Sequence, residues 1–174
     1  MLFRSYTFLN ERLAEHYGIE TVKGGDFRRV TLDDPARRGL LGKGAILMLT
    51  AYPNRTSPPV RGAWILDRLL GSPPPDPPLN VPSFPENRRG QPPKTLRARL
   101  EQHRANATCG ACHSAMDPLG LALENFNAVG QFRANDSDTL TPIDATGQLP
   151  DGTKINGAAD LRQALAGRPD HQFA

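Results

Sequence analysis

The stretch Cys109-Gly110-Ala111-Cys112-His113 decides how this sequence is interpreted, because it has the pattern Cys-x-x-Cys-His. The chain has two cysteines, and both lie in this stretch. Residues three apart share one face of a helix, so Cys109 and Cys112 can bond to the two vinyl groups along one edge of a porphyrin. His113 then lies beside the iron as its proximal ligand. The motif predicts covalent attachment of haem c.

Two other interpretations of the cysteine pair stay open. A disulfide or reactive thiol pair of the thioredoxin type opens a helix after a strand in a βαβ unit, and no βαβ pattern precedes Cys109. A structural zinc site needs about four ligands, usually from two separated pairs. The chain has no second cysteine pair, so haem attachment is the preferred interpretation.

The sixth ligand of the iron would decide what such a haem does. Met116 follows His113 by three residues, but reaching the far face of the porphyrin requires the chain to break at Asp117-Pro118. His103 lies shortly before the motif, and Met48 lies in the most apolar predicted helix. A Met or His ligand gives a low-spin electron carrier, whereas an open position lets peroxide or another small ligand bind. The sequence leaves these three candidates open.

Apolar residues at three- and four-residue steps predict helices in the first part of the chain. We expect a helix over residues 3–17, a short extended segment over 27–32, and helices over 37–51 and 60–70. Three glycines interrupt the 37–51 stretch, and they either weaken this helix or mark close packing.

Residues 72–82 contain six prolines in eleven positions, which excludes helix and central strand and favours extended polyproline II. We therefore predict a stiff Pro-rich linker over 72–94. It would separate a helical segment at 1–71, the end of a larger upstream domain, from a haem-binding domain at 95–174 that is incomplete at its C-terminus.

The sequence after the linker predicts short helices and strands around the haem motif. Thr95 can cap a helix over about 96–106, and a short helix from Leu121 is expected to end before Gly130. A turn at 150–152 predicts a β-hairpin, and a last helix follows over 158–166. The predicted fold class is mainly α: an irregular cytochrome-c-like haem domain with a small β-hairpin, preceded by the helical segment and the linker.

Four of the carboxylates that follow the motif are candidates for acid–base catalysis. Turn or capping positions in contact with solvent are the preferred interpretation, and Asp117 before Pro118 resembles a turn or a helix N-cap. The residues concerned are Asp117, Glu124, Asp144 and Asp151.

Composition excludes several classes of protein. The net charge is +3, with 21 basic and 18 acidic residues and no long basic run, so nucleic-acid binding is not expected. No stretch approaches about 18 consecutive apolar residues, so no membrane-spanning segment is predicted. The start of the chain lacks the pattern of a secretory signal. Because haem c is attached outside the cytoplasm, we expect an exported, periplasmic or extracytoplasmic location, with the signal on a longer full-length protein.

Several stretches together resemble one family, the large planctomycete-type c-type cytochromes, which are strings of domains of unknown function around a Cys-x-x-Cys-His site. The resemblance covers nearly the whole chain. The stretches that carry it include residues 6–14, 55–58, 101–104, 109–113, 116–126 and 149–152. It implies that the chain is a C-terminal part of a longer exported haem protein. The family has no settled activity, so the resemblance implies a cofactor and not a reaction.

Three functions remain open at this point. The first is electron transfer by haem c, with a redox partner protein or other domains of the full-length chain as partner. The second is a haem-dependent oxidative or peroxidase-like enzyme module. The third is an interaction scaffold whose haem is structural. The coordination state of the iron separates the first two.

Overall fold

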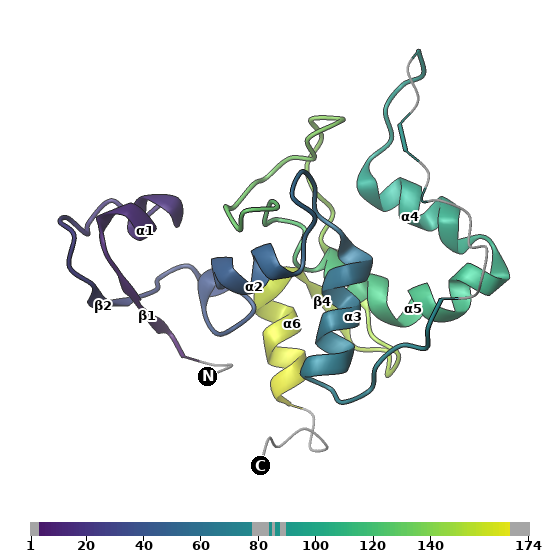
Figure 1. Ribbon diagram of the computed structural model, residues 1–174. Helices are drawn as coiled ribbons and strands as arrows, with labels where there is room; N and C mark the ends of the chain where they lie inside the picture. Colours follow the sequence, from purple (N-terminus) through teal and green to yellow (C-terminus); the bar gives the residue numbers. More distant parts are fainter. Residues whose placement is uncertain (1–3, 78–83, 85, 88–89, 168–174) are drawn as a thin grey trace.

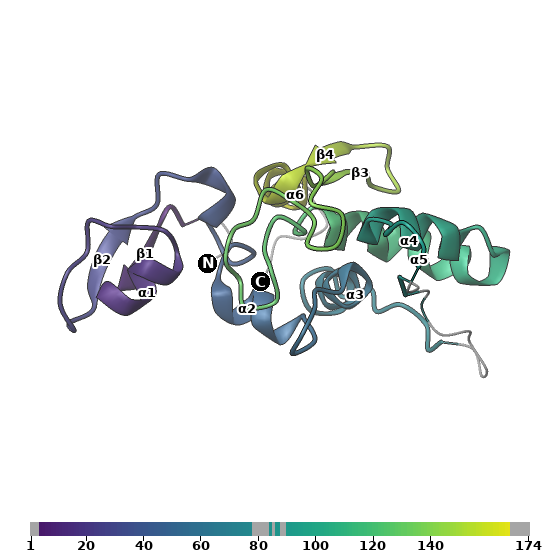
Figure 2. The same cartoon turned by 90° about the horizontal axis from the view of Figure 1, so that it is seen from above.

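The computed structural model describes residues 4–77, 84, 86–87 and 90–167. Six α-helices and two small antiparallel sheets lie within the described residues. An N-terminal unit occupies one end of the molecule, α2, α3 and α6 form the middle, and α4 and α5 lie side by side at the other end (Figures 1 and 2). The structure confirms the predicted mainly α fold class with a small β-hairpin.

The N-terminal unit corrects the predicted helix over 3–17. Strand β1 (Tyr6–Leu9) pairs antiparallel with β2 (Arg28–Thr31), and only α1 (Glu11–His16) is helical. Asn10 separates the strand from the helix, because its side chain accepts a hydrogen bond of 3.0 Å from the N–H of Leu13 and so caps α1. The extended segment predicted over 27–32 is confirmed as β2.

The predicted helix over 37–51 is also shorter than expected. A 3-10 turn (Pro35–Arg37) precedes α2 (Gly44–Leu49). Gly39 lies between them with a φ of +71°, a backbone conformation that ends a helix. A Cβ at Gly42 would lie 2.6 Å from backbone atoms of Arg37, so this glycine marks close packing.

Helices α3 (Pro58–Arg68) and α5 (Ala107–Leu121) cross at the centre of the fold. Two glycines bring their backbones together. A Cβ at Gly62 on α3 would lie 1.8 Å from the carbonyl oxygen of Met116, and a Cβ at Gly120 on α5 would lie 1.9 Å from that of Pro58. No side chain larger than hydrogen fits either position without a shift of the backbone.

The main core joins elements from both sides of the Pro-rich segment. It contains Leu47 and Ile65 from α2 and α3, Leu119 from α5, and Leu161 from the C-terminal helix, all at most 2% exposed. The division into segments 1–71, 72–94 and 95–174 stays a prediction. Residues 72–77 form no helix or strand, whereas 78–83, 85 and 88–89 of the predicted linker lie outside the described residues.

The later elements follow the sequence closely. Thr95 caps α4 (Leu96–Arg104) through a hydrogen bond of 3.1 Å from the N–H of Ala98. Strands β3 (Thr146–Gln148) and β4 (Lys154–Asn156) form the predicted hairpin, and α6 (Gly157–Ala166) is the predicted last helix. Within the described part of the chain, no helix is long and apolar enough to cross a membrane.

Candidate functional site

The Cys-x-x-Cys-His motif lies in the first turns of α5. Asn106 caps this helix, since its side chain accepts hydrogen bonds from the N–H groups of Thr108 (2.9 Å) and Cys109 (3.5 Å). Cys109, Cys112 and His113 therefore stand at helical positions i, i+3 and i+4, on one face. Both cysteines carry free thiols and are half-buried. The structure brings the three predicted attachment residues together.

Helix α5 does not end at the motif. It continues without a break through Pro118 to Leu121, although a short separate helix from Leu121 was predicted. Proline lacks an N–H, so the carbonyl of Ser114 receives no helical hydrogen bond from this position. The buried packing of the helix around Pro118 outweighs that loss, because residues 117–121 are all buried.

His113 has a buried acidic partner on the same helix. The Nδ1–H of His113 donates a hydrogen bond of 2.8 Å to Oδ1 of Asp117, which is 0% exposed. The other carboxylate oxygen, Oδ2, has no hydrogen-bond partner among the described residues, and Nε of Arg104 lies 3.7 Å from it. Asp117 is thus a helix-interior residue that orients His113, and its predicted place in a turn or N-cap is wrong.

This hydrogen bond provides a test of whether the residues fit a haem. A ligating histidine normally donates its second ring N–H to a carboxylate or carbonyl, which fixes the tautomer and raises the basicity of the ligating nitrogen. With Nδ1 held by Asp117, Nε2 of His113 remains for a metal. The spacing of Asp117 four residues after His113 is the sequence signal that could have revealed this pair.

The ring of His103 lies against the ring of His113. Their centroids are 4.8 Å apart with the planes at 73°, and the ring of Phe84 lies 6.1 Å from His103 on another side. His103 stands in the last turn of α4. Burial lowers the pKa of His103, the charge of His113 lowers it further, and Asp117 opposes the change. A neutral imidazole is favoured, which is the form that binds metals.

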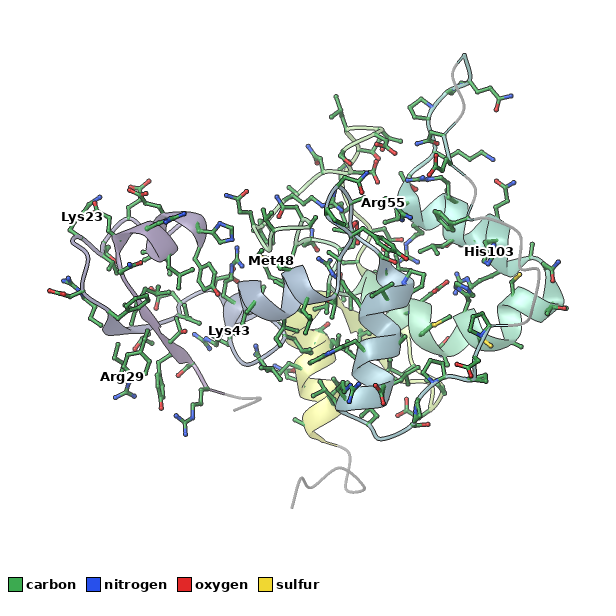
Figure 3. All side chains as sticks on the ribbon, in the orientation of Figure 1. Lys23, Arg29, Lys43, Met48, Arg55 and His103 are labelled. Atoms are coloured by element: carbon green, nitrogen blue, oxygen red, sulfur yellow. The ribbon has the colours of Figure 1, made fainter. Side chains whose placement is uncertain are left out.

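The two methionine candidates are placed differently. Met48 is 54% exposed on α2, and Figure 3 shows it on the opposite side of α3 from His103. Met116 lies three residues after His113 on the same unbroken helix, so the fold-back at Asp117-Pro118 that it needs to reach the far side of a porphyrin is absent. Among the described residues, the ring that lies against His113 is that of His103.

A hollow of about 210 Å³ opens beside the two histidines. Its walls come from the start of α3, from α4 and α5, and from Phe84, and most are apolar. Its lining includes Tyr52, Pro58, Val60, Leu96, His103 and His113. An apolar hollow that ends on a histidine suits a flat aromatic ligand. Among the residues that the structure describes, no group of three or more His, Cys, Asp or Glu side chains could hold a metal ion.

A buried ion-pair network joins α3 to the segment after α5, and no sequence pattern indicated it. Arg61 on α3 is 0% exposed and donates hydrogen bonds to the carbonyls of Leu123 (2.8 Å), Phe126 (2.9 Å) and Asn127 (3.0 Å). Burial lowers the pKa of Arg61 to about 10, so it stays charged at neutral pH. Arg61 therefore fixes the turn that follows α5.

Glu124 in that turn is 3% exposed, so its predicted contact with solvent is wrong. It accepts hydrogen bonds from Arg133 and from the hydroxyl of Thr56 (2.6 Å), and Arg61 lies 3.8 Å away. Asp144 is exposed as predicted, and it accepts hydrogen bonds from the N–H and hydroxyl of Thr146 at the start of β3. Through its hydrogen bond with Thr56, the buried carboxylate of Glu124 joins the loop before α3 to the segment after α5.

Comparison with known proteins identifies the family to which the chain belongs. Residues 37–136 match the family model PSCyt3, described as a protein of unknown function (DUF1588). Because the match covers more than half of the 174 residues, the chain belongs to this family, a planctomycete-type cytochrome c domain of unknown function. The matched region includes α3, α4 and α5. No curated protein and no solved structure matches the chain.

Proposed function

We propose that this chain binds haem c covalently through Cys109 and Cys112, with His113 as the proximal ligand of the iron. Three observations support the proposal. The two thiols and the imidazole share one face of α5, Asp117 holds Nδ1 of His113, and an apolar hollow lies beside the ring. The family name points to a cytochrome as well. Covalent attachment outside the cytoplasm implies an exported protein.

Each residue has a separate task in this proposal. The cysteine thiols form thioethers to the vinyl groups and fix the porphyrin on α5. His113 binds the iron through Nε2, and Asp117 keeps the ring in one orientation and tautomer. Nε of Arg104 lies 3.7 Å from Oδ2 of Asp117, so a cation faces the carboxylate oxygen that His113 does not contact. Haem c supplies one-electron chemistry when bound.

We further propose electron transfer as the function, with His103 as the sixth ligand. The observation that carries this proposal is the contact between the rings of His103 and His113, 4.8 Å between centroids. Two imidazoles on one iron give a six-coordinate, low-spin haem with no open position for a substrate. A haem held by both histidines would require their rings to lie further apart than they do here, and the short link Ala105–Asn106 between α4 and α5 would keep His103 close to the site. A redox partner protein or other domains of a longer exported chain would exchange the electron.

The test of attachment is an absorption spectrum of the protein expressed behind an export signal with a haem-c maturation system. We expect haem that survives acid–acetone extraction. Cys109→Ala combined with Cys112→Ala should remove it. Haem that stays attached to the double variant during denaturing electrophoresis would refute the attachment.

The sixth ligand is tested with the same preparation. Wild-type protein should show the sharp reduced α-band of low-spin haem, and His103→Ala should become high-spin. Added imidazole should restore the low-spin spectrum of this variant, which separates loss of a ligand from misfolding. Met48→Leu and Met116→Leu are the matched controls and should stay low-spin. A low-spin His103→Ala spectrum without imidazole would exclude His103, and a high-spin wild-type spectrum would favour the oxidative or peroxidase-like function.

A further inference from the structure

A second, larger hollow adjoins the one at His113. Its volume is about 510 Å³, and its lining is mostly polar. The two hollows share Arg55, Phe84 and Leu96, so they are adjacent and these three side chains lie at their common boundary. Figure 3 shows Arg55 at the end of α3 that lies next to α4.

The smaller hollow is not large enough to enclose a whole porphyrin. Sites that bury a drug-sized ligand have volumes of about 300–1,000 Å³. The hollow at His113, at about 210 Å³, is too small for a porphyrin by itself. A porphyrin bound to His113 would therefore extend beyond the smaller hollow, and Arg55, Phe84 and Leu96 line the side of it that borders the larger hollow.

The attachment chemistry decides which edge of the porphyrin would point away from α5. Thioethers from Cys109 and Cys112 hold the edge that carries the vinyl groups against α5. The two propionate carboxylates project from another edge, away from the thioethers. A cation is then expected where the porphyrin leaves the smaller hollow, because a partly buried carboxylate needs a charged partner or hydrogen-bond donors.

Arg55 is the cation at that position. Its guanidinium lies over the ring of Tyr52, 4.5 Å from the centroid, and it forms no ion pair with any described residue. The other arginines of the larger hollow have acidic partners: Arg99 pairs with Asp138 at 3.2 Å, and Arg133 pairs with Glu124. Among the arginines of this lining, Arg55 is thus the one whose guanidinium forms no ion pair with a described carboxylate and can bind an anionic ligand.

The contact with Tyr52 also leaves the N–H groups of Arg55 accessible to a carboxylate. Stacking on an aromatic ring uses the face of the guanidinium and leaves its N–H edge free for two parallel hydrogen bonds. A second donor in the same lining is unsatisfied as well, since Nε of Arg99 is buried without a hydrogen-bond partner among the described residues. We propose that Arg55 binds a haem propionate and thereby orients the porphyrin and raises the reduction potential of the iron.

The test rests on the proposed haem attachment and uses the holoprotein. It compares wild type with Arg55→Gln and Arg55→Lys, and Arg68→Gln on the exposed part of α3 is the matched control. Covalent haem is measured first, by staining after denaturing electrophoresis. The propionate bending band in resonance Raman spectra and the reduction potential at low and high salt are then measured.

All variants should retain covalent haem. Arg55→Gln should shift the propionate band and lower the potential, because a positive charge near the iron stabilises the reduced form. Arg55→Lys should keep most of the potential but still shift the band, since an ammonium cannot form the two parallel hydrogen bonds. An unchanged band and potential in Arg55→Gln would overturn the role of Arg55 while leaving haem attachment intact. Wild-type protein without covalent haem would overturn both.

Discussion

His113 and Asp117 stand one turn apart on α5 and are joined by a hydrogen bond of 2.8 Å. Because one rigid helix carries both residues, their relative orientation does not depend on the packing of a loop. Asp117 is fully buried, and the nearest cation to its second oxygen is Arg104, on the neighbouring helix α4. The candidate iron ligand is therefore positioned by α5 itself and linked electrostatically to α4.

The first prediction concerns Asp117→Asn. The amide keeps the shape of the side chain but removes the charge, so the imidazole of His113 becomes a weaker electron donor. We expect covalent haem to be retained and the reduction potential to rise, as measured by redox titration of the holoprotein. Asp67→Asn, on α3 beside Arg68, should leave the potential unchanged. An equal potential in wild type and Asp117→Asn would show that Asp117 does not act on the haem.

The second prediction concerns the crossing of α3 and α5. Gly62→Ala and Gly120→Ala each place a methyl group within 2 Å of a backbone carbonyl, which cannot rotate away as a side chain can. Overpacking of this kind costs about 1–3 kcal/mol or more of the free energy of unfolding, measured in urea. Gly25→Ala is the control, because its Cβ meets nothing within 4 Å and its φ is not positive. Equal stability of all three variants would contradict the close crossing.

How far the sequence could predict this fold depends on whether the signals were local. The β3–β4 hairpin, α3 and α6 follow from turn residues and apolar spacing within each element. Strand β1 was predicted as helix because its apolar spacing fits both structures, and its partner β2 lies about twenty residues away. The Asp117-Pro118 pair resembles a turn locally, and only the packing of α5 against α3 keeps it helical.

The candidate site also combines residues that a local pattern identifies with residues that only the fold brings together. The covalent motif is contiguous, so its residues could be named from the sequence. The role of Arg61 could not, because it depends on three carbonyls that lie more than sixty residues further along the chain. His103 was one of three candidate sixth ligands in the sequence, and its contact with the ring of His113 depends on the packing of α4 against α5, which no local pattern shows.

The third prediction follows from the hydrogen bonds that Arg61 donates to three backbone carbonyls. Arg61→Lys keeps the charge but cannot reach several carbonyls with one planar group, and it leaves buried acceptors without donors. We expect a loss of about 2–4 kcal/mol in the free energy of unfolding, and a larger loss for Arg61→Ala, which also leaves Glu124 short of a cation. Arg68→Lys, on the exposed side of the same helix, should change stability by less than about 0.5 kcal/mol. Comparable losses at both positions would argue against the buried network.

The last prediction concerns acid stability and the start of α4. Asp136 is 7% exposed and accepts hydrogen bonds from the N–H of Leu96 (3.2 Å) at the start of α4 and from Thr139 (3.0 Å) in its own loop. Burial alone would raise the pKa of Asp136, but these hydrogen bonds and one from the N–H of Asp138 lower it below its ordinary value of 3.8. The ionised carboxylate is therefore favoured by the folded state.

The sign of the pH effect follows from this lowered pKa. Above pH 3.8 the ionised Asp136 stabilises the fold, and this contribution is lost as the pH falls from 3.8 through the lower pKa of the folded state. Asp136→Asn should reduce the free energy of unfolding by about 1–3 kcal/mol at pH 7, and its stability should fall less steeply in acid than that of wild type. Urea unfolding between pH 7 and about pH 2.5 measures both effects, with exposed Asp33→Asn as the control. If Asp136→Asn and wild type lost stability in parallel below pH 4, the carboxylate would not be the group that ties this loop to α4, and the position of His103 at the far end of α4 would depend on the other contacts of that helix.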